Sequence, residues 1–104
     1  MAVHYSSGFG KLYDKDTKSI VADVKYQLTE TDDTKYTSKK WWGEFSTGQK
    51  LRKGDNYIII FEDARRGGCW ISFNTDRMPG KSSSVQYYRF FGRGKLGKHL
   101  SIKE

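Results

Sequence analysis

The sequence has very little cysteine and proline, and it has no long apolar run. It contains 1 cysteine and 1 proline among 104 residues, and no stretch approaches the ~18 apolar residues of a membrane span. One cysteine excludes an internal disulfide. The first residues lack the basic and apolar blocks of a secretory signal. The sequence therefore predicts no membrane span and favours a cytoplasmic protein.

The composition points to one small, strongly basic domain spanning residues 1–104. A chain of this length fits a single domain, and its 15% aromatic content supplies bulky side chains for one core. Lysine and arginine total 19 against 12 acidic residues, for a formal net charge of +7. Such a charge favours polyanionic partners, namely nucleic acid, an anionic membrane surface or an acidic protein. It also serves solubility alone in many soluble domains.

Short β-strands account for the apolar pattern, because no apolar period of ~3.6 persists over a helical length. Residues 57–61 form a continuous β-branched and aromatic run, which predicts a central strand covered on both faces. Residues 20–29 alternate strictly and predict a half-buried antiparallel strand. Further strands are expected over residues 41–46, 69–73 and 85–91, and a first strand is expected to have a bend or bulge near Gly8 and Gly10. A last short strand is possible at 100–102.

The connections are expected to be polar. Residues 30–40 predict a solvated loop, and Arg65-Arg66-Gly67-Gly68 predicts a tight turn that uses the conformational freedom of glycine. Leu51 is expected to anchor the 47–56 loop to the core. Gly-x-Gly-Lys-Leu occurs at residues 8–12 and again at 92–96, and it would lie at the barrel closure if the terminal strands pair.

These features predict the fold class. The protein is expected to be all-β, a single compact antiparallel barrel or sandwich of about six or seven short strands with little or no helix. Its size is that of an OB-like or SH3-like barrel. That comparison concerns architecture alone, and architecture does not fix function.

The catalytic and metal-binding patterns that we tested have little support. Gly80-Lys81-Ser82 resembles the end of a phosphate-binding loop, but Thr75 stands where the first glycine is required. Nucleophile-elbow and triad patterns are absent, and His4 and His99 are far apart in sequence. Cys69 is expected to be a buried, inert thiol. The sequence therefore predicts a non-catalytic protein with no cofactor and no metal.

Aromatic residues interleaved with basic ones are the remaining signal. Cationic side chains meet phosphates, and flat aromatic faces stack on unpaired bases. Strand alternation predicts that Tyr88 and Phe90 point inward. The predicted site for single-stranded nucleic acid comprises Trp42, Arg65, Arg66, Trp70, Tyr87, Arg89, Arg93 and Lys95, with Lys39, Lys40 and Lys81 attracting the backbone.

Two other kinds of function stay open at this point. An outward Trp42, Trp70 and Tyr87 could form an interaction patch for an acidic protein partner or for a second copy in a homodimer. Alternatively, the aromatic residues could line an interior cavity for a small ligand. Cross-strand aromatic packing also stabilises a small barrel without any ligand.

Overall fold

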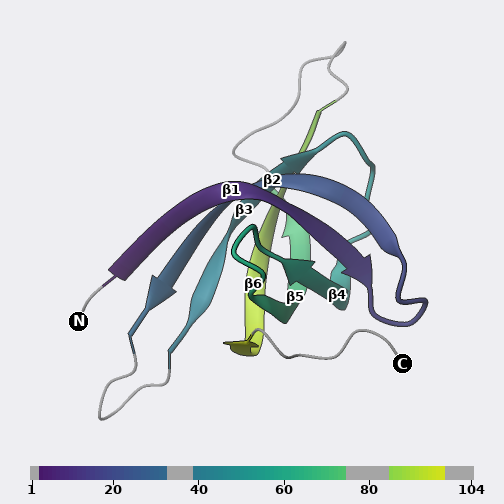
Figure 1. Ribbon diagram of the computed structural model, residues 1–104. Coiled ribbons are helices and arrows are strands. Elements are labelled where there is room, and N and C mark those ends of the chain that lie inside the picture. The colour runs from purple at the N-terminus through teal and green to yellow at the C-terminus, as the bar shows by residue number, and fades with distance from the viewer. Residues whose placement is uncertain (1–2, 33–38, 75–84, 98–104) are drawn as a thin grey trace.

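The computed structural model is an all-β barrel, described over residues 3–32, 39–74 and 85–97 without the side chain of Lys95 (Figure 1). Within these ranges there is no helix, and hence none that could cross a membrane. The strands are β1 (Val3–Asp14), β2 (Ile20–Thr31), β3 (Trp41–Thr47), β4 (Gly54–Ile60), β5 (Arg66–Phe73) and β6 (Gln86–Gly97). The predicted fold class is confirmed. Of the two predicted alternatives, sandwich and barrel, the structure is a closed antiparallel barrel.

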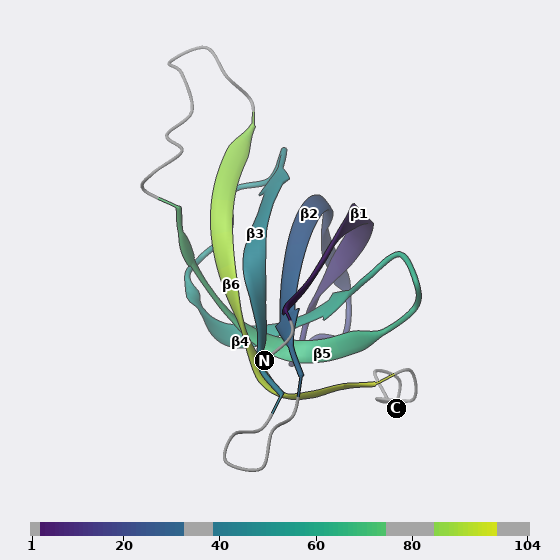
Figure 2. The ribbon, with the colours of Figure 1, turned by 90° about the vertical axis from the view of Figure 1, so that its left-hand side faces the viewer.

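The barrel joins two antiparallel meanders, β1-β2-β3 and β4-β5-β6, in the order β1-β2-β3-β6-β5-β4. Closure comes from β3 pairing with β6 and from β1 pairing with β4. Figure 2 shows β6 beside β3, with β2 and β1 following in turn. The first and last strands do not pair, so the condition under which both copies of Gly-x-Gly-Lys-Leu would meet at the closure is not fulfilled. Strand β1 finds its second partner in the middle of the sequence.

Strand alternation fills the interior as the sequence predicts. Tyr88 and Phe90 of β6 are buried, as are Trp41 and Phe45 of β3. Leu51 packs against this core from the connection between β3 and β4. The remaining core residues are Leu12, Ala22, Val24, Tyr26, Leu28, Tyr57, Ile59, Phe61, Cys69 and Ile71.

Alternation fails at strand ends, where the barrel no longer covers the inner face. Ile20 opens β2 and Phe73 closes β5, and both are exposed although their sequence positions predict core. Ile58 shows the opposite behaviour. It is buried but lies outside the core cluster, so β4 is covered on both faces over this part, as the run 57–61 predicts.

The turn between β4 and β5 lies earlier than predicted. The chain reverses through Glu62, Asp63 and Ala64, and Ala64 adopts the positive φ of 76°. Gly67 and Gly68 belong to β5 instead. The prediction failed because glycine also serves close packing, and a Cβ on Gly67 would stand 2.7 Å from the Trp41 indole.

Of the bend or bulge predicted near Gly8 and Gly10, the bulge is absent. Strand β1 runs without interruption past Gly8 and Gly10, and its register shifts only between Leu12 and Tyr13. Gly10 is required because a Cβ there would overlap the carbonyl oxygen of Ile60 on β4. The last predicted strand, 100–102, lies outside the described residues.

Trp41 closes one end of the barrel. Its indole Nε1 donates a hydrogen bond to the carbonyl of Gly94 at 3.0 Å, and its ring meets that of Phe61 edge-on at 6.0 Å. A Cβ on Gly92 would overlap the same indole. Glycines in β5 and β6 therefore make the space that this large side chain occupies.

Candidate nucleic-acid interface

Three aromatic side chains from three neighbouring strands form one row on the outer face of the barrel. The strand register places Trp42 of β3 directly opposite Phe91 of β6, and Phe91 directly opposite Trp70 of β5. The ring centroids of Trp70 and Phe91 are 5.6 Å apart. Trp42 is 38% exposed and Phe91 is 41% exposed, so their faces are accessible. We call Trp42, Phe91 and Trp70 the aromatic row.

The inner face explains why these rings point outward. Each member of the row is followed or preceded by a buried residue that takes the inner side, namely Trp41, Phe90 and Ile71. Successive side chains of a strand point to opposite faces. Because those neighbours are buried in the core, the rings of the aromatic row must lie on the outer face.

Strand β6 presents aromatic and cationic side chains in alternation along the same face. Tyr87, Arg89, Phe91 and Arg93 share its outer side, with successive members ~7 Å apart along an extended strand. Arg89 stands between Glu44 of β3 and Ser72 of β5 in the cross-strand register. It therefore lies two residues along β6 from Phe91 of the aromatic row, on the same face. A guanidinium at this place can reach a phosphate of a ligand that stacks on the row.

Arg93 lies on the other side of the aromatic row. It is opposite Gly68 of β5, and its Nη2 lies 3.5 Å from a carboxylate oxygen of Asp55 on β4. The side chain of Arg93 therefore reaches across β5 to β4. Both groups of this ion pair are well exposed, so the pairing is weak and a phosphate could compete for the guanidinium.

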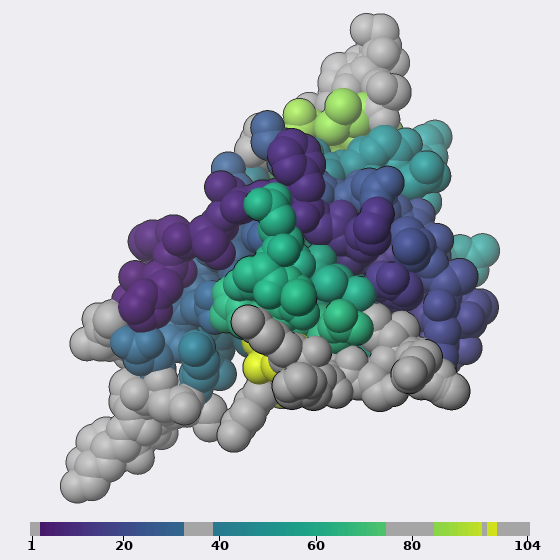
Figure 3. Space-filling model, in the orientation of Figure 1, coloured from purple at the N-terminus to yellow at the C-terminus, as the bar shows by residue number. Residues whose placement is uncertain are grey.

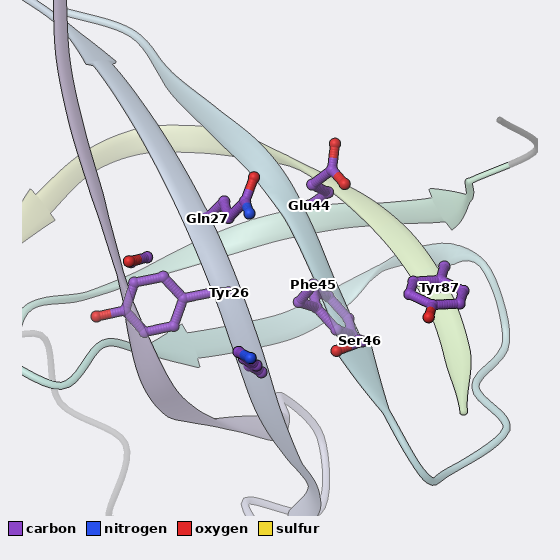
Figure 4. Close-up of a pocket in the computed structure, with 8 residues that line it drawn as sticks. Tyr26, Gln27, Glu44, Phe45, Ser46 and Tyr87 are labelled. Carbon is purple, nitrogen blue, oxygen red and sulfur yellow. The ribbon is translucent and has the colours of Figure 1, made fainter. Parts of the chain in front are cut away.

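A polar groove of about 270 Å³ adjoins the row across β1, β2, β3 and β6. Figure 4 shows Gln27, Glu44 and Tyr87 on three neighbouring strands at this groove. An amide, a carboxylate and a phenol offer donors and acceptors for the edge of a planar heterocycle. The groove is lined by Ser7, Lys25, Tyr26, Gln27, Glu44, Phe45, Ser46 and Tyr87.

Arg65 is not part of this face, because it is held at the barrel end by Glu30. Its Nη1 and Nη2 donate to the two carboxylate oxygens of Glu30 at 2.7 and 2.9 Å, and its Nε donates to Asp63 at 2.8 Å. The hydrogen bonds to Glu30 raise the pKa of Arg65 above its usual value. This guanidinium is occupied by protein carboxylates and holds the β4–β5 turn against β2.

Glu30 itself is a correction to the predicted solvated loop. It belongs to β2 and is only 6% exposed. It continues the inward series of that strand, one alternation beyond Leu28. A glutamate after an alternating apolar segment predicts the start of a loop. The sequence does not show that Glu30 is buried, because its partner Arg65 is 35 positions away.

The other predicted site residues divide as follows. Trp42, Trp70, Tyr87, Arg89 and Arg93 come together on the outer face. Arg66 is part-buried at the start of β5, and its Nε has no hydrogen-bond partner among the described residues. The backbone of Lys95 lies in β6, whereas its side chain and Lys81 lie outside the described residues.

Sequence reasoning missed Phe91, Gln27 and Glu44 as site residues. Phe91 could have been found, because the inward assignment of Phe90 places its neighbour outside with Arg89. The groove could not, because Gln27 and Glu44 meet only through the pairing of β2 with β3. Cross-strand neighbours are not encoded in either strand alone.

The described residues give no support to metal or thiol chemistry. No group of three or more metal-ligating side chains occurs within residues 3–32, 39–74 and 85–97. His4 instead contacts Asp32 at 2.8 Å. Cys69 is fully buried, and burial raises the pKa of its thiol to about 12, so the thiolate needed for reaction is absent at neutral pH.

Comparisons of the chain with family models, with curated proteins and with solved structures found no match.

Proposed function

We propose that the protein is a non-catalytic binding module that holds single-stranded nucleic acid on the outer face of β3, β6 and β5. The aromatic row carries the proposal. Trp42, Phe91 and Trp70 form a stacking surface that crosses three strands, and Arg89 and Arg93 flank it on the same face. Stacking of bases on aromatic rings together with cationic contacts to phosphates is how sequence-tolerant single-strand binding works.

The groove gives this face a means of contacting base edges. Glu44 can accept a hydrogen bond from an exocyclic amine, and the amide of Gln27 both donates and accepts. Unpaired bases expose these edges, whereas paired bases do not. The combination of an exposed ring surface and a polar groove therefore favours single strands over duplex.

A protein partner is the second candidate. Tryptophan, tyrosine and arginine dominate the energetics of protein interfaces, and all three types occur on this face. Salt dependence separates the two functions, because release of counterions from nucleic acid makes affinity fall steeply with salt. An interior ligand site has less support, since the ring of Phe90 packs against those of Phe45 and Phe61 inside the barrel.

The test is anisotropy of a fluorescently labelled single-stranded oligonucleotide, titrated with protein from low to physiological salt. Phe91→Ala should weaken binding by ~1–3 kcal/mol, the value of one lost base–aromatic stack. Phe73→Ala is the matched control, because Phe73 is an exposed phenylalanine of neighbouring β5 that lies off the aromatic row. Arg89→Gln should also reduce the slope of log affinity against log salt by about 1.

Two results would contradict the proposal. One is wild-type protein that leaves the anisotropy unchanged even at low salt. The other is an equal loss of affinity in Phe91→Ala and Phe73→Ala when both variants keep the native circular dichroism spectrum, because that result would locate binding away from the row.

A further inference from the structure

The barrel has a seam along which β1 lacks a second partner. Strand β4 pairs with β1 only from Lys11 to Asp14, whereas β1 pairs with β2 from Val3 onward. Residues 3–10 therefore have a strand on one side only within the described chain. Figure 1 shows this half of β1 extending away from β4, and Figure 3 shows the same segment at the molecular surface.

The main-chain groups on the open side can be assigned from their neighbours. The N–H of Phe9 donates to the carboxylate of Glu62 at 2.9 Å, and the N–H of Lys15 donates to the main-chain carbonyl of Asn56 on β4 at 2.8 Å. Both lie on the side away from β2. Main-chain groups of alternate residues point to the same side of a strand, so Val3, Tyr5 and Ser7 direct their N–H and C=O groups outward along the seam.

This open edge lacks the devices by which proteins protect an edge strand. Residues 3–9 contain no proline, lysine or acidic residue, and β1 is regular over this part. Lysine, proline and bulges are the usual protection against pairing with another chain. On the outer side of the edge, Tyr5 is 79% exposed and Phe9 is 68% exposed.

We propose that this edge pairs with the same edge of a second copy of the chain, antiparallel about a two-fold axis at Tyr5. In this register Tyr5 faces Tyr5 of the partner subunit, and Val3 faces the partner's Ser7. The main-chain N–H and C=O groups of all three residues point away from β2, so the two residues of each pair exchange two main-chain hydrogen bonds. The register ends before Phe9, whose N–H is already bound by Glu62.

Two features favour a second copy over another occupant. The segment is complementary to itself under a two-fold axis, as a symmetric dimer interface requires. It also brings no two like charges together, although the whole chain carries a net charge of +7, because residues 3–7 contain no lysine, arginine or acidic residue and His4 contacts the carboxylate of Asp32. A short ladder is smaller than the ~1,200–2,000 Å² of a stable interface, so the dimer is expected to be weak and concentration-dependent.

Disulfide trapping tests the register directly. In Tyr5→Cys the two introduced cysteines face each other as a hydrogen-bonded pair, with Cα atoms ~5.5 Å apart, within the range that a disulfide spans. In the control Phe9→Cys, a cysteine at another well-exposed position of the same strand lies ~27 Å from its symmetry mate. The native Cys69 is buried in both variants.

We expect Tyr5→Cys to form a covalent dimer under mild oxidation at least tenfold faster than Phe9→Cys. Equal rates, or no dimer from either variant, would overturn the proposal. In a second measurement, sedimentation of the wild type should show mass rising with concentration, and Tyr5→Pro should remain monomeric because it loses an outward N–H that the β1–β2 ladder does not use.

If Tyr5→Pro fails to fold, Tyr5→Lys replaces it, since two lysines would then face each other across the axis. Undiminished association of a folded Tyr5→Pro or Tyr5→Lys would place the contact elsewhere and refute the edge. A wild type that stays monomeric at every concentration would refute the dimer. No nucleic acid enters these experiments, so their outcome is independent of the proposed binding function.

Discussion

Replacing Gly92 with alanine should destabilise the barrel by about 2–4 kcal/mol, because no space exists for one additional methyl group. The new Cβ would overlap three ring atoms of Trp41. That indole cannot easily move away, since its Nε1 is bound to the carbonyl of Gly94 at 3.0 Å and its ring contacts Phe61 and Phe90.

The magnitude follows from two contributions. Forcing an extra methyl group into a packed interior costs ~1–3 kcal/mol. Displacing the indole also breaks its hydrogen bond to Gly94, worth ~1 kcal/mol. For a domain near this size, a loss of 1 kcal/mol lowers the melting temperature by roughly 4–8 °C, so the variant should melt roughly 8–30 °C below the wild type.

Chemical denaturation followed by circular dichroism measures the effect. Gly97→Ala is the control, because a Cβ on this residue of the same strand would meet no described residue within 4 Å. It should leave the free energy of unfolding within ~0.5 kcal/mol of the wild type. Combining Gly92→Ala with Trp41→Leu should cost at least ~1 kcal/mol less than the sum of the two single variants, since the smaller side chain vacates the contested space.

A Gly92→Ala variant as stable as Gly97→Ala would refute this reasoning. It would mean that the Trp41 indole does not lie against β6, and that the end of the barrel is closed by other side chains.

The remaining predictions concern buried polar and ionisable groups. Glu30→Gln should lower the free energy of unfolding by about 2–4 kcal/mol, because it removes the charge that pairs with the part-buried Arg65. Asp23→Asn, which breaks the exposed pair with Lys11, should show no measurable change in the same denaturation assay, and equal effects would contradict the assigned burial. Burial raises the pKa of Cys69 from 9.0 to about 12. Above pH 9 the unfolded chain loses this proton while the folded chain keeps it, so folding is disfavoured by ~1.4 kcal/mol for each pH unit between these values. The free energy of unfolding of Cys69→Ala should therefore fall less steeply than that of the wild type as the pH rises from 9 to 11, and parallel slopes would show that Cys69 is not buried.

The sequence by itself determined, for most strand residues, whether the side chain points into the barrel or out of it. Trp41 and Trp42 are adjacent in sequence, yet one is core and the other is surface. The same holds for Phe90 and Phe91. An extended chain turns every second side chain to the same face. The apolar residues of a strand therefore show, without reference to other strands, which face is buried. For this reason the inward Tyr88 and the outward Tyr87 and Arg89 could be predicted without knowing any neighbour.

Only the tertiary structure decided which residues from different strands meet. The aromatic row requires Phe91 to lie between Trp42 and Trp70, and a register shift of one residue would turn every side chain of β6 to the other face. Glu30 is core because Arg65, far along the chain, reaches its carboxylate. Register and ion pairing depend on how all six strands pair in the closed barrel. The sequence of one strand does not specify which residues of its neighbours lie opposite.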